Sequence, residues 1–233
     1  MGDAARGRSK RRRPKTAAGK RRAETWRLKK LLEIEAEYWD RGIEHVAGVD
    51  EAGRGPLAGP VFAAAVILPP RTPIRGVDDS KRIPAERREA LFDEIRDIAI
   101  AIAIGAASTR EVDQLNILRA SHLAMLRALR KLPVQPQQVI VDGLPVPQLG
   151  EDHRAVVDGD EKVHCIACAS IVATVVRARL MRMLAGRSPG YGWDHNAGYG
   201  TPDHREAIFE LGLTPHHRRS FEPNMQLTLQ LPI

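Results

Sequence analysis

The chain has 233 residues, of which 43% are hydrophobic and 28% are charged, a composition typical of a soluble globular protein with one sizeable core. It contains only two cysteines, Cys165 and Cys168, which excludes a multi-bridge disulfide framework and is typical of a protein of the reducing cytoplasm. The sequence has no uncharged apolar run long enough for a membrane helix and no apolar stretch behind its basic start, so we expect neither a membrane span nor a signal peptide.

The net charge of +7 is concentrated at the N-terminus. Residues 1–22 contain ten lysines and arginines and one aspartate, a net charge of +9, so the rest of the chain carries −2. Such a segment cannot bury apolar surface, and we predict a disordered basic arm over residues 1–24 and one folded domain over residues 25–233. The arm would attract any polyanion by counterion release, and a solvated tail without a partner is the alternative.

Hydrophobic periodicity predicts an α/β fold. The predicted strands first follow one another and then alternate with helices, so we expect a mixed sheet with helices on its faces. In chain order the predicted elements are helix 25–39, strands 45–49 and 61–68, helix 85–95, strand 98–104, helix 110–131, strands 138–141 and 155–157, and helices 163–184 and 203–211, with loops over 189–202 and 216–221.

A glycine-rich segment, Gly53-Arg54-Gly55-Pro56-Leu57-Ala58-Gly59, follows the first predicted strand. A dinucleotide-binding loop would have to open a helix, whereas here an apolar run over residues 61–68 continues into another strand. We therefore expect these glycines to form a tight turn or to let a ligand approach the main chain closely.

Acidic residues stand at the ends of three predicted strands. Asp50 and Glu51 follow one strand, Asp142 follows another, and Asp160 follows a third just before a helix. Carboxylates that converge beyond the strand ends repel one another, and a divalent cation is the usual remedy. Oxygen-only ligands favour Mg²⁺ or Mn²⁺, and two such ions about 4 Å apart would activate a water for phosphodiester hydrolysis. Taken singly, each aspartate can also be interpreted as a turn or cap residue.

An ordered series of motifs resembles bacterial type 2 ribonuclease H (ribonuclease HII). Residues 46–61, VAGVDEAGRGPLAGPV, closely resemble the first motif of that family. Further matches follow in the family's order, and together they span residues 45–223: Asp79-Ser80-Lys81, Val141-Asp142-Gly143, Gly159-Asp160, Ala169-Ser170-Ile171, Gly198-Tyr199-Gly200-Thr201 and His216-His217-Arg218-Arg219-Ser220-Phe221.

The resemblance implies a ribonuclease H-like fold with a helical C-terminal extension. It also implies an endonuclease that cuts the RNA strand of RNA-DNA hybrids, or cuts 5′ of ribonucleotides embedded in duplex DNA, leaving 3′-hydroxyl and 5′-phosphate ends. The implied enzyme is a monomer that uses one or two Mg²⁺ or Mn²⁺ ions. The metal-binding and catalytic set would be Asp50, Glu51, Asp142 and Asp160.

The resemblance also assigns the substrate-binding residues. It implies that the main chain of Gly53-Arg54-Gly55 senses the 2′-hydroxyl and that the ring of Tyr199 packs on the neighbouring deoxyribose. Lys81 and Arg218 are further candidates for phosphate contacts; a role in a helix cap for the motif of Lys81, and a solvated loop for Arg218, are the alternatives.

Two departures from the family pattern lie in the predicted helix 163–184. Ala173-Thr174 stands where the family usually has Ala-Lys, and Arg177-Ala178 stands where it has Arg-Asp. We expect altered substrate affinity from the loss of this lysine and aspartate, with the acidic set retained. Residues 193–197 also lack a lysine that often precedes the Gly-Tyr motif.

The sequence also suggests three other residues as candidate metal ligands. Cys165 and Cys168 form a C-x-x-C pattern beside a histidine, but a closed zinc site needs four ligands and no second pair stands nearby, so we interpret them as buried helix residues. Asp158 is the nearest rival of Asp160 as the fourth carboxylate.

Two other functions remain open. One is a related metal-dependent nuclease of this fold that acts on another nucleic-acid structure, such as a DNA junction. The other is a non-catalytic RNA-binding protein that uses the basic arm.

Overall fold

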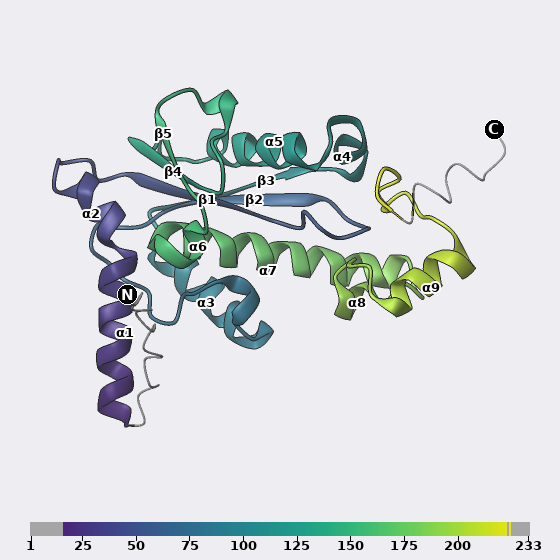
Figure 1. Cartoon of the computed structure of the whole chain (residues 1–233), viewed down its shortest axis with the longest axis horizontal. Helices are drawn as coiled ribbons and strands as arrows, with labels where there is room; N and C mark the ends of the chain where they lie inside the picture. The colour runs from purple at the N-terminus through teal and green to yellow at the C-terminus, as the bar shows by residue number, and fades with distance from the viewer. Residues whose placement is uncertain (1–15, 223, 225–233) are drawn as a thin grey trace, which may run out of the picture.

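One mixed sheet of five strands forms the centre of the molecule (Figure 1). The computed structural model describes residues 16–222 and 224. The strands are β1 (Val46–Ala52), β2 (Val61–Ile67), β3 (Ala101–Ala107), β4 (Gln138–Asp142) and β5 (His153–Val156). They lie in the order β3-β2-β1-β4-β5, in which β1 and β3 are antiparallel to β2 whereas β1, β4 and β5 are parallel. The predicted mixed sheet is confirmed.

Helices cover both faces of this sheet (Figure 1). The long α7 (His164–Arg187) packs on β1 and β2 with α3 (Ala85–Ile98) beside it, and α5 (Ile117–Arg130) packs against β2 and β3. Neighbouring residues of β2, such as Ala63 and Ala64, belong to different apolar clusters because side chains alternate along a strand. The remaining helices are α1 (Ala17–Leu31), α2 (Glu33–Trp39), α4 (Thr109–Leu115), α6 (Gly159–Lys162), α8 (Trp193–Asn196) and α9 (Pro202–Leu211), with short 3-10 turns η1 (Ser80–Arg82) and η2 (Pro147–Leu149).

The close packing of α7 on β1 depends on Gly48. A Cβ atom on Gly48 would lie 2.3 Å from the backbone carbonyl carbon of Cys165, so a larger side chain would push the helix away from the sheet. By length and composition α7 could cross a membrane, but 72% of its most apolar window is buried inside the protein. It is therefore a core helix, and it carries side chains of the candidate site.

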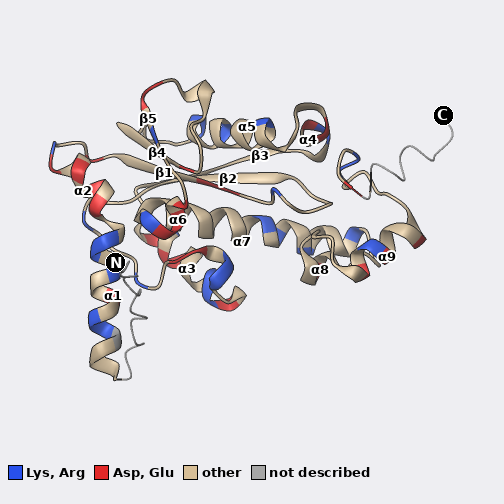
Figure 2. Ribbon diagram, in the orientation of Figure 1, with Lys and Arg blue, Asp and Glu red and all other residues tan. Residues whose placement is uncertain are grey.

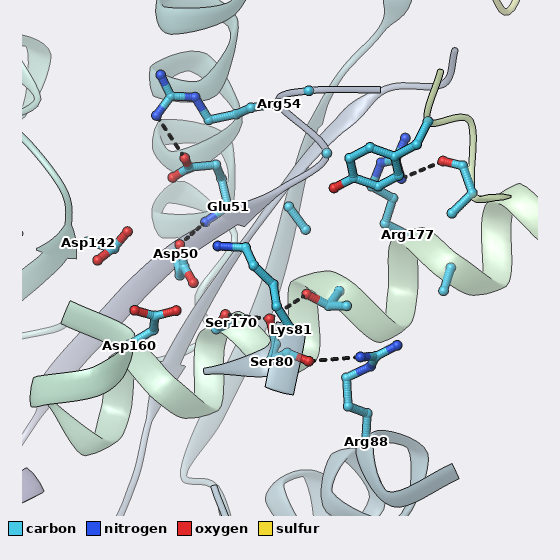
Figure 3. A pocket seen from close by; sticks show the side chains of 17 residues that line it. Asp50, Glu51, Arg54, Ser80, Lys81, Arg88, Asp142, Asp160, Ser170 and Arg177 are labelled. Carbon is cyan, nitrogen blue, oxygen red and sulfur yellow. Dashed lines mark hydrogen bonds and ion pairs between the residues drawn. The ribbon is translucent and has the colours of Figure 1, made fainter. Parts of the chain in front are cut away.

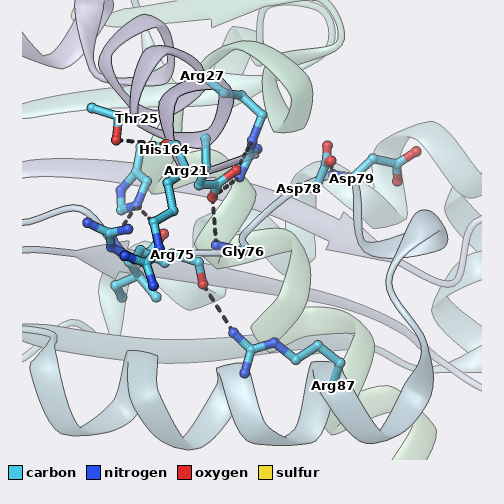
Figure 4. Close-up of polar contacts among 11 residues, drawn as sticks. Arg21, Thr25, Arg27, Arg75, Gly76, Asp78, Asp79, Arg87 and His164 are labelled. Carbon is cyan, nitrogen blue, oxygen red and sulfur yellow. Dashed lines mark hydrogen bonds and ion pairs between the residues drawn. The ribbon is translucent and has the colours of Figure 1, made fainter. Parts of the chain in front are cut away.

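The N-terminal helix begins earlier than the sequence predicts. One helix was expected over residues 25–39 after a disordered arm, but α1 begins at Ala17 and Leu32 separates it from α2. Thr16 caps α1 by accepting from the Gly19 amide at 3.1 Å. Glu24 docks the helix, since it accepts from the Gly76 amide at 3.1 Å and pairs with Arg27. Figure 4 shows Arg27 and Gly76 on the two segments that this contact joins. Residues 1–15 of the predicted arm lie outside the described residues, and the domain boundary stays a prediction.

Two other predicted elements differ in detail. The helix expected over residues 110–131 is divided into α4 and α5 at Asn116, whose φ of +67° interrupts the helix while its side chain caps α5 through the Arg119 amide. The strand expected over residues 98–104 is β3, three residues later, because Ile98 still belongs to α3. The expected loop over residues 189–202 contains the short α8.

Candidate active site

Four carboxylates line one pocket of about 380 Å³ (Figure 3), and they are Asp50, Glu51, Asp142 and Asp160. Strand β1 carries the first two, β4 ends at the third, and α6 carries the fourth just after β5. Val49 lies opposite Val141 in the parallel register, so Asp50 and Asp142 follow on neighbouring strands at the same edge of the sheet. The Gly159 amide donates to Oδ1 of Asp142 at 2.6 Å and joins α6 to this edge.

The charges in the pocket act on one another. Burial, with repulsion from Glu51 and Asp142, raises the pKa of Asp50 well above its ordinary value. Burial also raises the pKa of Glu51, and Arg54, whose Nη1 lies 3.2 Å from Oε1 of Glu51, opposes this rise. Burial and then the charge of Asp142 raise the pKa of Asp160. The pocket thus concentrates negative charge that a bound cation would relieve.

The donor set fits a hard divalent cation. All four side chains offer carboxylate oxygens, the ligands that Mg²⁺ and Mn²⁺ prefer. Within residues 16–222 and 224, no three acidic, histidine or cysteine side chains are grouped closely enough to hold an ion by themselves. A cation bound here would therefore take part of its coordination from water or from a phosphate of the substrate.

A glycine turn forms the adjacent wall of the pocket. Gly53 has a φ of +93°, and a Cβ atom there would lie 2.1 Å from Nε of Arg177, so only glycine fits. A Cβ atom on Gly55 would lie 3.7 Å from Cε1 of Tyr199, a residue that is 48% exposed and lines the same pocket. The segment leads directly into β2, so the expectation of a tight turn, and not of a dinucleotide-binding loop, is confirmed.

Arg177 holds this turn in place. Its guanidinium donates to the carbonyl oxygens of Ala58 at 3.0 Å, Pro60 at 3.2 Å and Ala197 at 2.9 Å. It therefore joins the glycine turn to the segment that carries Tyr199. Burial lowers the pKa of Arg177 to about 10.

Arg218 does not occupy the position that the resemblance suggested. Its side chain is 0% exposed, which argues against the expected phosphate contact. Its guanidinium donates to the carbonyl oxygens of Gly59 at 2.9 Å, Arg54 at 2.8 Å and Gly53 at 2.5 Å, and burial lowers its pKa to about 9. Arg218 is a positioning residue that fixes the main chain of the glycine turn from inside the protein.

Lys81 lies on the opposite side of the pocket, in η1 (Figure 3). Its amide donates to Oδ1 of Asp79 at 3.0 Å, so the cap expected at this motif is present. The positive charge of Lys81 opposes the rise in the pKa of Asp160. The side chain is thus placed where a phosphate could bind beside the acidic edge.

Sequence reasoning gave no role to a polar network behind Asp50. Ser170 hydrogen-bonds to Asp50 and lies 3.0 Å from Oγ of Ser80, and Thr174 lies 3.1 Å from the same atom. Arg88 donates to the Ser80 carbonyl at 2.8 Å. The motifs of Ser80 and Ser170 were matched in the sequence, whereas Arg88 gave no signal. Thr174, one of the departures, is therefore part of the pocket wall.

The remaining candidates have structural roles. Cys165 and Cys168 are buried and free, and burial raises the pKa of both thiols, which supports their interpretation as inert helix residues. Asp158 adopts a left-handed conformation, with φ of +55°, and lies 3.5 Å from Lys162. It does not line the pocket, so the geometry favours Asp160.

The protein combines a mixed sheet flanked by helices with a carboxylate-lined pocket at one edge of the sheet and a glycine turn beside it. This fold and site are those of a ribonuclease H-like nuclease, which hydrolyses phosphodiesters. The family model described as ribonuclease HII matches residues 47–224. The chain belongs to the ribonuclease HII family.

Individual proteins agree with this assignment. The chain is 54% identical over 190 residues to a ribonuclease HII of Cereibacter sphaeroides, covering 81% of this chain and 89% of that protein. The crystal structure of ribonuclease H2 from Pyrococcus horikoshii matches with a TM-score of 0.67 and 26% identity, covering 78% of this chain and 96% of that chain. Bst-RNase HIII, solved in complex with Mn²⁺, shares the fold with a TM-score of 0.62 and 18% identity, covering 80% of this chain and 70% of that chain.

Proposed function

We propose that this ribonuclease H hydrolyses the RNA strand of RNA-DNA hybrids and cuts 5′ of ribonucleotides embedded in duplex DNA. The products would carry 3′-hydroxyl and 5′-phosphate ends. One observation carries the proposal: a single pocket combines four carboxylates with a glycine turn and an exposed tyrosine ring. The first group suits hydrolysis of a phosphodiester, and the other two suit discrimination between ribose and deoxyribose.

The acidic edge would hold the metal. Asp50, Glu51, Asp142 and Asp160 would bind one or two Mg²⁺ or Mn²⁺ ions, which activate a water and stabilise the leaving oxygen when bound. The protein orients these ligands before any ion arrives, because Oδ1 of Asp50 accepts from the Glu51 amide at 2.6 Å and Asp142 accepts from α6.

Selection of the ribonucleotide would depend on the main chain. The absence of side chains at Gly53 and Gly55 lets backbone groups reach a 2′-hydroxyl, the one group that separates RNA from DNA at a given sugar. The ring of Tyr199 would pack on the neighbouring deoxyribose and disfavour a second hydroxyl there. Lys81 would contact a phosphate beside the acidic edge.

The partners follow from the same chemistry. Basic residues along α1, visible in Figure 2, would add affinity for the phosphate backbone: Arg21, Arg22, Lys29 and Lys30.

The location proposed for the protein is the cytoplasm, because its two buried cysteines are free and suit a reducing compartment. We propose that it acts there as a monomer.

The test uses three duplexes of one sequence: all DNA, DNA with a single ribonucleotide, and an RNA-DNA hybrid. We expect cleavage of the second and third in Mg²⁺ or Mn²⁺, none in EDTA, and ligatable 5′-phosphate products. The Asp50→Asn variant serves as the inactive control. Equal cleavage of the all-DNA duplex would instead favour a nuclease for another DNA structure.

A second variant tests the RNA-binding alternative. Removal of residues 1–15 leaves α1 and its Thr16 cap in place. We expect this shortened protein to cleave the single-ribonucleotide duplex. A non-catalytic RNA-binding protein that uses the basic arm would bind RNA much more weakly after this deletion and would show no hydrolysis in either metal.

A further inference from the structure

Two buried histidines lie behind the segment that carries Tyr199. His204 in α9 is 0% exposed and His217 is 2% exposed. They pack with the rings of Tyr191 and Trp193, and the centroids of Tyr191 and His217 are 4.9 Å apart. Neither histidine lines the pocket, and the hydrolysis proposed above uses neither.

The hydrogen bonds assign a proton to each imidazole. The indole Nε1–H of Trp193 can only donate, and it donates to Nε2 of His204 at 3.0 Å. Nε2 of His204 is therefore an acceptor, so the proton of this neutral ring is on Nδ1. From there it is donated to the carbonyl oxygen of Tyr199 at 2.8 Å.

The second imidazole supports this tautomer. The Thr214 amide donates to Nδ1 of His217 at 2.9 Å, so the proton of His217 is on Nε2. That nitrogen lies 3.3 Å from Nε2 of His204 and donates to it. Burial lowers the pKa of His204, and burial lowers the pKa of His217 to about 4, so both rings are neutral at pH 7.

This pair also lies next to the glycine turn. His217 forms a β-bridge with Ala58, and the Leu57 amide donates to the Gly198 carbonyl at 2.8 Å. Tyr199 is therefore fixed through its carbonyl by His204 and through the preceding residue by the glycine turn. The Tyr199 carbonyl also accepts from the Thr201 amide at 2.8 Å, and the Tyr199 amide donates to the Asn196 carbonyl at 2.9 Å. His204 adds a side-chain hydrogen bond to these main-chain bonds, and together they set where the Tyr199 ring lies relative to Gly55.

We propose that His204 is a positioning residue for substrate discrimination. Its Nδ1–H holds the Tyr199 carbonyl, and this bond sets the ring against the sugar next to the ribonucleotide. The inference rests on the proposed function of Tyr199. It predicts that the chemistry survives loss of this bond, whereas the preference for a single ribonucleotide over a continuous RNA strand declines.

Two substitutions separate the nitrogens of His204. His204→Asn places an amide N–H near the position of Nδ1 and can still donate to Tyr199. His204→Gln places an oxygen near the position of Nε2 that accepts from Trp193, and its NH2 group is at the end of the side chain, so no donor stands at the position of Nδ1 beside the Tyr199 carbonyl. The readout is kcat/KM on the single-ribonucleotide duplex divided by kcat/KM on the continuous hybrid.

We expect this ratio to fall about tenfold in His204→Gln, which corresponds to about 1.4 kcal/mol, and to stay within about twofold of wild type in His204→Asn. In a Tyr199→Ala background, His204→Gln should not change the ratio further, because the two residues act through one interaction. A fall of both kcat/KM values by the same factor, or an equal loss in the two His204 variants, overturns the proposal.

A measurement on the unmodified protein covers the case in which His204→Gln fails to fold. Nitrogen NMR of histidine-labelled protein reports the tautomer of each ring, and we expect the Nδ1–H form for His204 and the Nε2–H form for His217. An Nε2–H form for His204 would refute the inference. If wild type leaves the single-ribonucleotide duplex uncut, the proposed function fails, but the tautomer result is unaffected.

Discussion

Replacement of Arg218 by methionine tests whether this side chain supports the glycine turn or contacts the substrate. Methionine fills similar volume but donates nothing to the carbonyl oxygens of Gly53, Arg54 and Gly59. Each lost hydrogen bond costs about 1 kcal/mol net, so we expect the free energy of unfolding to fall by about 3 kcal/mol. The substitution also removes the buried positive charge of Arg218, and this gain keeps the loss of stability from being larger.

The assay is urea unfolding of Arg218→Met beside wild type and Arg219→Met. Arg219 is the exposed neighbour, and its substitution should change stability by less than about 0.5 kcal/mol. A phosphate contact at Arg218 would give the opposite pattern: unchanged unfolding, a raised KM and a weaker salt dependence of binding. That pattern would refute the assignment of Arg218 as a positioning residue.

Three further substitutions test the core and its buried charges. Gly48→Ala should lower the free energy of unfolding by about 2 kcal/mol in urea, because the new Cβ would meet the α7 backbone at 2.3 Å, and unchanged stability would contradict this packing. Burial raises the pKa of Glu35 from 4.5 to about 7, so the folded state keeps a proton that the unfolded state releases between these pH values. The free energy of unfolding should therefore fall by about 3 kcal/mol from pH 4.5 to 7 on account of Glu35, and Glu35→Gln should remove that part of the slope in urea titrations. Asp50→Asn should raise the urea midpoint at pH 7, since it removes a buried charge that Glu51 and Asp142 repel, and a lower midpoint would show that the carboxylate stabilises the fold.

The sequence predicted the sheet well because its strands are strongly apolar and bounded by turn residues. It failed where a single residue decides the geometry. Asn116 separates α4 from α5 because its φ is positive, and the regular spacing of leucines does not predict this backbone conformation. The first half of α1, residues 17–24, was assigned to the basic arm by charge alone, yet it is helical and Glu24 docks it to a distant loop.

In the candidate site, too, some residues could be predicted from the sequence and others could not. Asp50 and Asp142 could be placed together because both follow apolar runs that form neighbouring parallel strands. Arg218 could not be placed, because a basic motif has the same sequence whether its guanidinium faces solvent or the interior. The roles of Arg88 and His204 depend on contacts with segments distant in the sequence, so no local sequence pattern predicts these roles.

The two buried guanidinium groups have a consequence beyond support of the turn. Within the described residues, the hydrogen bonds of Arg177 and Arg218 all go to uncharged carbonyl oxygens. Neither guanidinium has a carboxylate among these hydrogen-bond partners, although the charge of Asp113 acts on Arg218. The two positive charges are therefore solvated mainly by dipoles, and they lie beneath the turn that would face the nucleic acid. Under the proposed function, the acidic edge would repel a phosphate until a cation binds, whereas the turn would attract a phosphate without a cation. A nucleic-acid strand bound at the turn would thus hold a phosphodiester next to the carboxylates. Binding at the turn would not require metal, and the approach of the phosphodiester to the acidic edge would require it.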